Sequence, residues 1–268
     1  MPNYLVTNDD GIDSPALADL VDALRRLPDT RVYVVAPSEQ WSAGGHSITI
    51  REPLYVEERP SEHFEVPAWR VEGSPADCVK LALNHLLDEP IDLVVSGINL
   101  GYNVATDVLY SGTVAAAIEG VLAGTPALAV SSGKEDGNRG DYRVPAIVAA
   151  AMTDMIRRIS TNPWLLNVNV PDVSPEELAG VSFTELGPCP YDDKVLVTED
   201  ASGRLCYRLG VDVNAEAATE GTDLFAVRAN RISITPLEVL RVTQMELLGD
   251  LSRMSAELEN SLARDLSV

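Results

Sequence analysis

Lysine is scarce in this chain, and carboxylates outnumber cations. Of the 268 residues, 41 are aspartate or glutamate and 20 are lysine or arginine, which gives a formal net charge of −21. The three lysines are Lys80, Lys134 and Lys194. Such a surface repels polyanions, which excludes a nucleic acid polymer or an anionic membrane as a large-area partner. The acid excess has two open explanations, a salt-rich cytoplasm or a plain bias of genome composition.

Cysteine, long apolar runs and a dinucleotide fingerprint are also rare or missing. The three cysteines, Cys78, Cys189 and Cys206, lack metal-site spacing, so we expect reduced thiols. No apolar run reaches the roughly 18–20 residues of a membrane-spanning helix. The chain enters its first predicted strand at once, which leaves no room for a signal peptide, and we expect a cytoplasmic protein. No G-x-G-x-x-G follows that strand, which argues against a nicotinamide or flavin dehydrogenase.

Up to about residue 170, strand-like and helix-like segments alternate regularly. Short apolar runs predict strands at residues 4–7, 31–36, 92–96, 128–131 and 164–170. Helical spacing of apolar residues falls between them, near residues 14–27, 73–87, 111–120 and 144–159. The alternation predicts an α/β fold with a three-layer, doubly wound, mostly parallel sheet.

After about residue 173 the pattern changes. The predicted features are a hairpin around residues 195–209, an acidic surface loop at 214–223, a returning strand at 231–236 and an amphipathic terminal helix at 244–266. Such a helix packs either on its own domain or on a partner subunit. We therefore divide the chain into a catalytic core at residues 1–172 and a C-terminal arm, with its hairpin, returning strand and helix, at residues 173–268.

Two adjacent carboxylates follow the first predicted strand. Asp9 and Asp10 stand where the apolar run ends, and Gly11 permits the backbone turn that lets both side chains converge. Two carboxylates about 4 Å apart repel by roughly 4 kcal/mol at an effective dielectric of 20, and a divalent cation removes that repulsion. The alternative is a solvated turn in which Asp10 lies near a helix N-cap.

Further polar groups stand at later strand ends, where parallel sheets usually build their sites. A polar loop after the second strand leads into an alternating β-type run at residues 46–50. Asn99 follows another strand, as an amide-oxygen ligand or as an ordinary turn residue. Ser111, Gly112 and Thr113 precede an alanine-rich helix, whose N–H groups and dipole favour an anion there. An ordinary N-cap explains the same residues.

Six stretches occur in an order that resembles a known family. They are residues 5–15, 35–37 with 42–50, 73–79, 95–103, 110–114 and 233–237. Together they resemble the SurE survival-protein family, the acid-type 5′/3′-nucleotidases. The resemblance implies a Rossmann-like domain, a β-rich arm used to form a homodimer or homotetramer, and a phosphomonoesterase that needs a divalent metal. Departures from the family pattern fall at Ala16, Ser38, Trp41 and Ala105, and Ala105 stands where a glycine is frequent.

The family's metal ligands, carried over position by position, fall on Asp9, Asp10, Ser42 and Asn99. Mg²⁺ or Mn²⁺ suits this set of oxygen donors, whereas zinc more often recruits histidine or cysteine. Asp9 and Asp10 are therefore expected to hold one divalent ion and to act as the catalytic pair. We rank attack by water above a route through an aspartyl intermediate.

The phosphate of a nucleoside monophosphate is expected to bind Asn103, Ser111, Gly112 and Thr113. His46 is either an acid for the leaving group or a partner in a structural hydrogen bond. Two other functions stay open: a broader phosphatase or exopolyphosphatase, and a non-catalytic nucleotide-binding stress protein.

Overall fold

The structure is a computed structural model that describes residues 1–59, 64–133, 141–156, 164–188, 191–213 and 218–239. The chain divides into two compact units, Met1–Leu237 and Glu238–Val268. The fold described below belongs to the first unit. Within the described residues, no helix is both long and apolar enough to cross a membrane.

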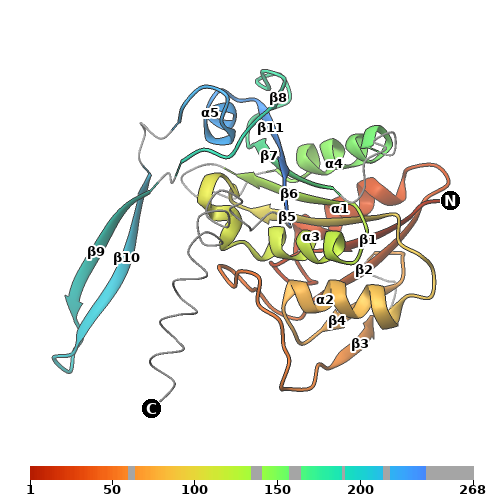
Figure 1. The fold of residues 1–268 in the computed structure, drawn as a ribbon, viewed down its shortest axis with the longest axis horizontal. Coiled ribbons are helices and arrows are strands. Elements are labelled where there is room, and N and C mark those ends of the chain that lie inside the picture. The colour runs from red at the N-terminus through yellow and green to blue at the C-terminus, as the bar shows by residue number, and fades with distance from the viewer. Residues whose placement is uncertain (60–63, 134–140, 157–163, 189–190, 214–217, 240–268) are drawn as a thin grey trace, which may run out of the picture. The chain divides into compact units, whose positions relative to one another are not determined.

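Most strands of this unit belong to one mixed sheet. They are β1 (Asn3–Thr7), β2 (Arg31–Pro37), β3 (Val56–Arg59), β4 (Ala68–Val71), β5 (Leu93–Leu100), β6 (Ala127–Gly133), β7 (Leu165–Pro171), β8 (Val181–Phe183) and β11 (Ile232–Leu237). Their order across the sheet is β3-β4-β2-β1-β5-β6-β7-β11-β8 (Figure 1). The strands from β4 to β7 are parallel neighbours, while β3 and β11 run antiparallel to β4 and β7.

Helices cover both faces of this sheet. They are α1 (Pro15–Arg25), α2 (Pro75–Leu81), α3 (Gly112–Leu122), α4 (Arg143–Ile156) and α5 (Asp223–Arg228), with a π-helical turn η1 (Ala82–Leu86) and a 3-10 turn η2 (Ala105–Leu109). Helix α1 packs beside α4 and α2 beside α3, and the two pairs lie on opposite faces (Figure 1). The predicted three-layer, doubly wound α/β fold is confirmed.

Apolar spacing explains why α1 forms and which way it faces. Leu17, Leu20 and Leu24 recur at helical intervals and are fully buried against the sheet. Strand β1 is buried along its whole length, as expected for a central strand covered by helices on both faces. Packing in the core thus fixes the position of β1 and of the residues that directly follow it.

The direction in which the chain fills the sheet reverses beside β1. The chain passes from β1 outward to β2 and β4, and then returns to β5 on the other side of β1. Thr7 of β1 is in register with Ser96 of β5. Ligands of open α/β sheets bind at the carboxyl ends of strands at such a switch point. Residues 8–10 and 97–100 lie there.

The C-terminal part of this unit contributes both to the main sheet and to a separate hairpin. Strands β8 and β11 complete one edge of the sheet, and β11 confirms the predicted returning strand. Strands β9 (Tyr191–Glu199) and β10 (Leu205–Val213) pair antiparallel, and Asp200 N–H donates to Arg204 O in the turn, which confirms the hairpin. The predicted terminal helix lies outside the described residues.

Two local predictions differ from the structure, and a third lies partly outside the described residues. Residues 46–50 form no strand, because their polar groups bond to the N-terminus of α2: Ser74 donates to Ser47 O, and Thr49 donates from N and Oγ1 to Asp77. Helix α5 begins at Asp223, where we expected a loop to continue. The described part of α4 ends at Ile156, and the last three residues of the predicted helix lie outside the described residues.

Candidate active site

Asp9 is a buried carboxylate at the end of β1. Its side chain is 4% exposed, and Thr113 Oγ1 donates to Asp9 Oδ1 over 2.5 Å. Burial raises the pKa of Asp9 from 3.8 to about 6, against the opposing hydrogen bond from Thr113 and with help from the charge of Asp10. The buried position therefore disfavours the charged form of this carboxyl group.

The loop after β2 carries Gln40, whose side chain hydrogen-bonds to both Asp10 and Ser42. Gln40 Nε2 donates to Asp10 Oδ1 over 3.3 Å and to Ser42 Oγ over 2.7 Å. Trp41 N–H donates to Asp9 O over 2.7 Å, which fixes this loop beside the end of β1. One nitrogen atom therefore lies within hydrogen-bond distance of two predicted metal ligands. Sequence reasoning missed Gln40, although its position two residues before Ser42 marks it as a neighbour.

Asn99 reaches the same edge because β5 bulges just before it. The pairing of β5 with β6 shifts register between Gly97 and Asn99. A Cβ on Gly97 would lie 2.3 Å from Val130 O, so this close approach requires glycine. Asn99 Nδ2 donates to Gly101 O over 2.9 Å, which makes the amide oxygen the candidate ligand atom. Leu100 N–H donates to Asp10 Oδ2 over 3.3 Å and joins the end of β5 to the carboxylates.

The four predicted ligands thus lie at one edge of the sheet, and their chemistry fits a hard divalent ion. Two carboxylates, a hydroxyl and an amide oxygen are donors that Mg²⁺ and Mn²⁺ accept. No group of three or more histidine, cysteine, aspartate or glutamate side chains is placed to hold a metal ion within the described residues. A metal site at this edge would therefore depend on the mixed oxygen donors.

The N-terminus of α3 abuts Asp9. Ser111 is the N-cap, and its Oγ accepts from Val114 N over 3.1 Å. A Cβ on Gly112 would lie 2.8 Å from Asp9 Cβ, so the missing side chain lets the helix approach the carboxylate. The N–H groups of the first turn lack intrahelical partners and suit an anion. Thr113 is fully buried with its hydroxyl on Asp9, so its side chain holds the carboxylate.

Asn103 has its side chain directed into the protein. Its Nδ2 donates to Ser131 Oγ over 2.8 Å, and the side chain is 6% exposed. Its backbone carbonyl accepts from Asn167 Nδ2 over 2.8 Å and from Asn169 Nδ2 over 3.1 Å. The structure therefore places this predicted phosphate-binding residue as an anchor of the loop between β5 and α3.

His46 lies in an ion-pair cluster next to the loop that carries Ser42. His46 Nε2 is 2.8 Å from Glu119 Oε1, and Lys80 Nζ is 2.9 Å from Glu119 Oε2. Glu119 is buried on α3, so this contact ties residue 46 to the helix that abuts Asp9. Of the two roles considered for His46, this contact supports the structural one.

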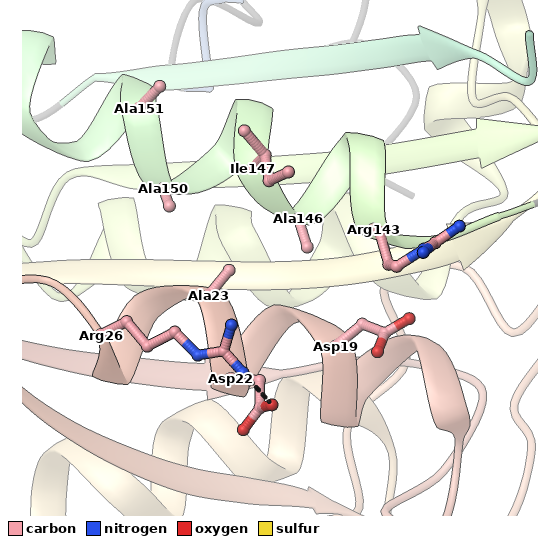
Figure 2. Close-up of a pocket in the computed structure, with 9 residues that line it drawn as sticks. All are labelled: Asp19, Asp22, Ala23, Arg26, Arg143, Ala146, Ile147, Ala150 and Ala151. Carbon is pink, nitrogen blue, oxygen red and sulfur yellow. Dashed lines mark hydrogen bonds and ion pairs between the residues drawn. The ribbon is translucent and has the colours of Figure 1, made fainter. Parts of the chain in front are cut away.

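A cavity of about 590 Å³ lies elsewhere, between α1 and α4 (Figure 2). Asp19, Asp22, Arg26 and Arg143 lie along it, and alanines and Ile147 form the rest of its wall. It includes none of the predicted site residues, and its helices cover the face opposite α3.

Comparisons with known proteins show the family of the chain. The family model described as "Survival protein SurE" matches residues 4–193. The chain belongs to the SurE family.

SurE relatives match along nearly the whole chain. The chain is 43% identical over 251 residues to the protein named 5′-nucleotidase SurE from Heliobacterium modesticaldum, which covers 92% of this chain and 90% of the relative. It is 42% identical to the protein of that name from Desulforudis audaxviator, over 96% of this chain and 99% of the relative. The crystal structure of the SurE protein from Aquifex aeolicus superposes with a TM-score of 0.83 at 33% identity, covering 95% of this chain and all of that one.

Proposed function

We propose that this SurE family member is a divalent-metal-dependent phosphomonoesterase that hydrolyses nucleoside 5′- or 3′-monophosphates to nucleoside and phosphate. The observation that carries the proposal is the pair Asp9 and Asp10 at the switch point of the sheet, with the N-terminus of α3 packed against Asp9. The relatives named 5′-nucleotidase SurE are hydrolases by name, which agrees with the predicted enzyme class.

Asp9, Asp10, Ser42 and Asn99 would hold the metal ion. An ion held by these residues would screen the charge of the phosphate and lower the pKa of a nearby water. Asp9, whose Oδ1 accepts from Thr113 Oγ1, would orient or deprotonate the attacking water. Gln40 binds Asp10 and Ser42 and would keep both oriented.

The first turn of α3 would hold the phosphoryl group. The N–H groups of Gly112 and Thr113 begin the helix, and Ser111 Oγ is already used by Val114 N. Backbone donors of this kind are preorganised for negative charge that grows on the phosphoryl oxygens. Trp41 and Tyr110 flank this edge, and Gly45 N–H donates to Tyr110 O, which keeps the two loops together.

Phosphate release from a panel of nucleoside monophosphates tests the proposal. Each substrate is assayed with Mg²⁺, with Mn²⁺ and with excess chelator, and inorganic polyphosphate and a phosphodiester are assayed alongside. We expect hydrolysis of monophosphates that disappears with chelator and returns with metal. Full activity in chelator would exclude the metal route, preference for polyphosphate would favour the broader phosphatase, and nucleotide binding without turnover would favour the non-catalytic module.

A homo-oligomer is proposed because the hairpin exposes apolar side chains. Val195, Leu196 and Val197 of β9 are each more than half exposed, and Leu205 and Tyr207 of β10 are more exposed still. Adjacent residues of a strand point to opposite faces, so both faces of the hairpin carry apolar surface. We expect light scattering to give the mass of a dimer or tetramer, and a monomer at micromolar concentration would contradict this.

A further inference from the structure

A carboxylate from the C-terminal part of the chain supports the loop between β5 and α3. Asp223 is fully buried at the start of α5. Its Oδ2 accepts from Ala105 N over 2.7 Å, although 118 residues separate the two in sequence. Its Oδ1 accepts from Gly187 N over 2.9 Å and from Leu224 N over 2.8 Å. One carboxylate therefore joins the loop between β5 and α3 to the segment that precedes the hairpin.

Ala105 needs this support because of its backbone conformation. Its φ is +50°, in the left-handed region that a residue with a Cβ rarely adopts. The residue is 1% exposed and opens the turn η2, which leads directly to Ser111. A hydrogen bond to a buried, charged acceptor is strong enough to hold such a conformation. Glycine would adopt it without the bond.

Among the bonds that hold this loop between its predicted functional ends, two are made by side chains from later in the sequence. Asn103 is held by the side chains of Asn167 and Asn169, and Ala105 is held by Asp223. Asn99 precedes both anchors, and the α3 N-terminus follows them. Loss of the second anchor would let Ala105 relax to negative φ and redirect the chain toward Ser111. Misplacement of catalytic groups by about 1 Å costs on the order of 100-fold in rate.

We propose that Asp223 is a positioning residue for hydrolysis, which acts through Ala105 on the placement of the α3 N-terminus. The inference rests on the proposed phosphomonoesterase function. It also gives the C-terminal part of the chain a role in the active site.

The test compares four forms of the full chain: wild type, Asp223→Asn, Ala105→Gly and the double variant. We expect Asp223→Asn to lower kcat for a nucleoside monophosphate with Mg²⁺ by about 10- to 100-fold. We expect KM to stay within about threefold, because the N–H groups that bind phosphate remain present. Ala105→Gly alone should keep wild-type kcat, and it should restore the double variant to within about threefold, because glycine adopts a positive φ without the steric cost that alanine has there.

Asp200→Asn is the matched control. Asp200 also accepts backbone N–H groups, from Ser202 over 2.8 Å and Arg204 over 3.0 Å, but in the exposed turn between β9 and β10. This variant should keep wild-type kcat.

Two kinetic results would overturn the inference. Folded Asp223→Asn with wild-type kcat would make the residue merely structural. A kcat loss that Ala105→Gly does not repair would show that Asp223 does not act through Ala105. A wild type without metal-dependent hydrolysis overturns the proposed function and this inference with it, whereas an active wild type beside an equally active Asp223→Asn overturns the inference alone.

Amide hydrogen exchange in the wild type decides the case if Asp223→Asn does not fold. The Ala105 N–H should exchange about as slowly as the core amides of β5, because it is buried and bonded to Asp223. Exchange at the rate of an exposed loop would show that the anchor is not formed and would overturn the inference.

Discussion

Asp9 and Glu119 are buried to the same degree, yet they face opposite surroundings. Asp9 is 4% exposed and Glu119 is 5% exposed. Glu119 lies between Lys80 Nζ and His46 Nε2, both within 2.9 Å. Asp9 faces the hydroxyl of Thr113 and the charge of Asp10, and none of the ion pairs found among the described residues includes it. A buried carboxylate that is paired with a lysine supports structure, whereas we propose that the Asp9–Asp10 pair binds an ion.

The largest expected effect is a loss of hydrolysis, and it belongs to the Asp9–Asp10 region and not to the region of Glu119. Asp10→Asn should lower metal-dependent hydrolysis by about 10³-fold, because it removes a proposed metal ligand and one of the two neighbouring negative charges. Nucleotide binding should persist, since the change lowers repulsion of the anion. Phosphate release and calorimetric binding measure the two effects. The control is Asp13→Asn, an exposed carboxylate three residues away, and hydrolysis by Asp10→Asn within tenfold of wild type would contradict the assignment.

The second effect concerns stability without metal. The folded-state pKa of Asp9 is about 6, above its ordinary 3.8, so between these values the folded chain binds more protons than the unfolded chain. The unfolding free energy therefore falls as pH rises through this window, by about 3 kcal/mol once pH exceeds 6. Asp9→Asn should remove this loss. Urea unfolding in chelator at pH 5 and at pH 7.5 measures this change in the unfolding free energy. An equal pH dependence in Asp9→Asn and in the wild type would refute the prediction.

Glu119→Gln should destabilise the chain by about 2 kcal/mol, because it leaves Lys80 and His46 without their shared carboxylate while both stay partly solvated. Urea unfolding in chelator gives the value. Asp141→Asn breaks an exposed pair with Arg143 and should change little. If Glu119→Gln is as stable as the wild type, Glu119 does not stabilise the structure, and the contrast drawn with Asp9 is wrong.

The smallest expected effect on kcat comes from steric crowding at the start of α3. Gly112→Ala should lower kcat about tenfold, because a Cβ there lies 2.8 Å from Asp9 Cβ and moves the carboxylate or the helix. Gly120→Ala is the control on the same helix: its Cβ lies 2.8 Å from Val94 Cγ2, away from Asp9, so it should cost stability and spare kcat. Equal effects of both changes on kcat would show that Gly112 has no special relation to Asp9.

The sequence predicts the features that depend on neighbouring residues. Strand β1, helix α1 and the N-cap at Ser111 follow from apolar periodicity and cap chemistry, and each appears where expected. The convergence of strand ends follows from the rule for parallel sheets. That rule predicts that Asp9 and Asn99 lie at the same edge of the sheet.

Features that depend on distant contacts could not be predicted. Residues 46–50 alternate like a strand, but the cap of α2 binds their polar groups instead of a neighbouring strand. The role of Asp223 arises from Ala105, and no local pattern links them. Asn103 resembled a phosphate ligand by its place near the site, but its side chain bonds to Ser131.

Anomalous diffraction from a crystal grown with Mn²⁺ tests the central claim most directly. The account predicts one strong peak among Asp9, Asp10, Ser42 and Asn99, with their side-chain oxygens as ligands. A peak elsewhere, or these four side chains splayed apart around no ion, would contradict it.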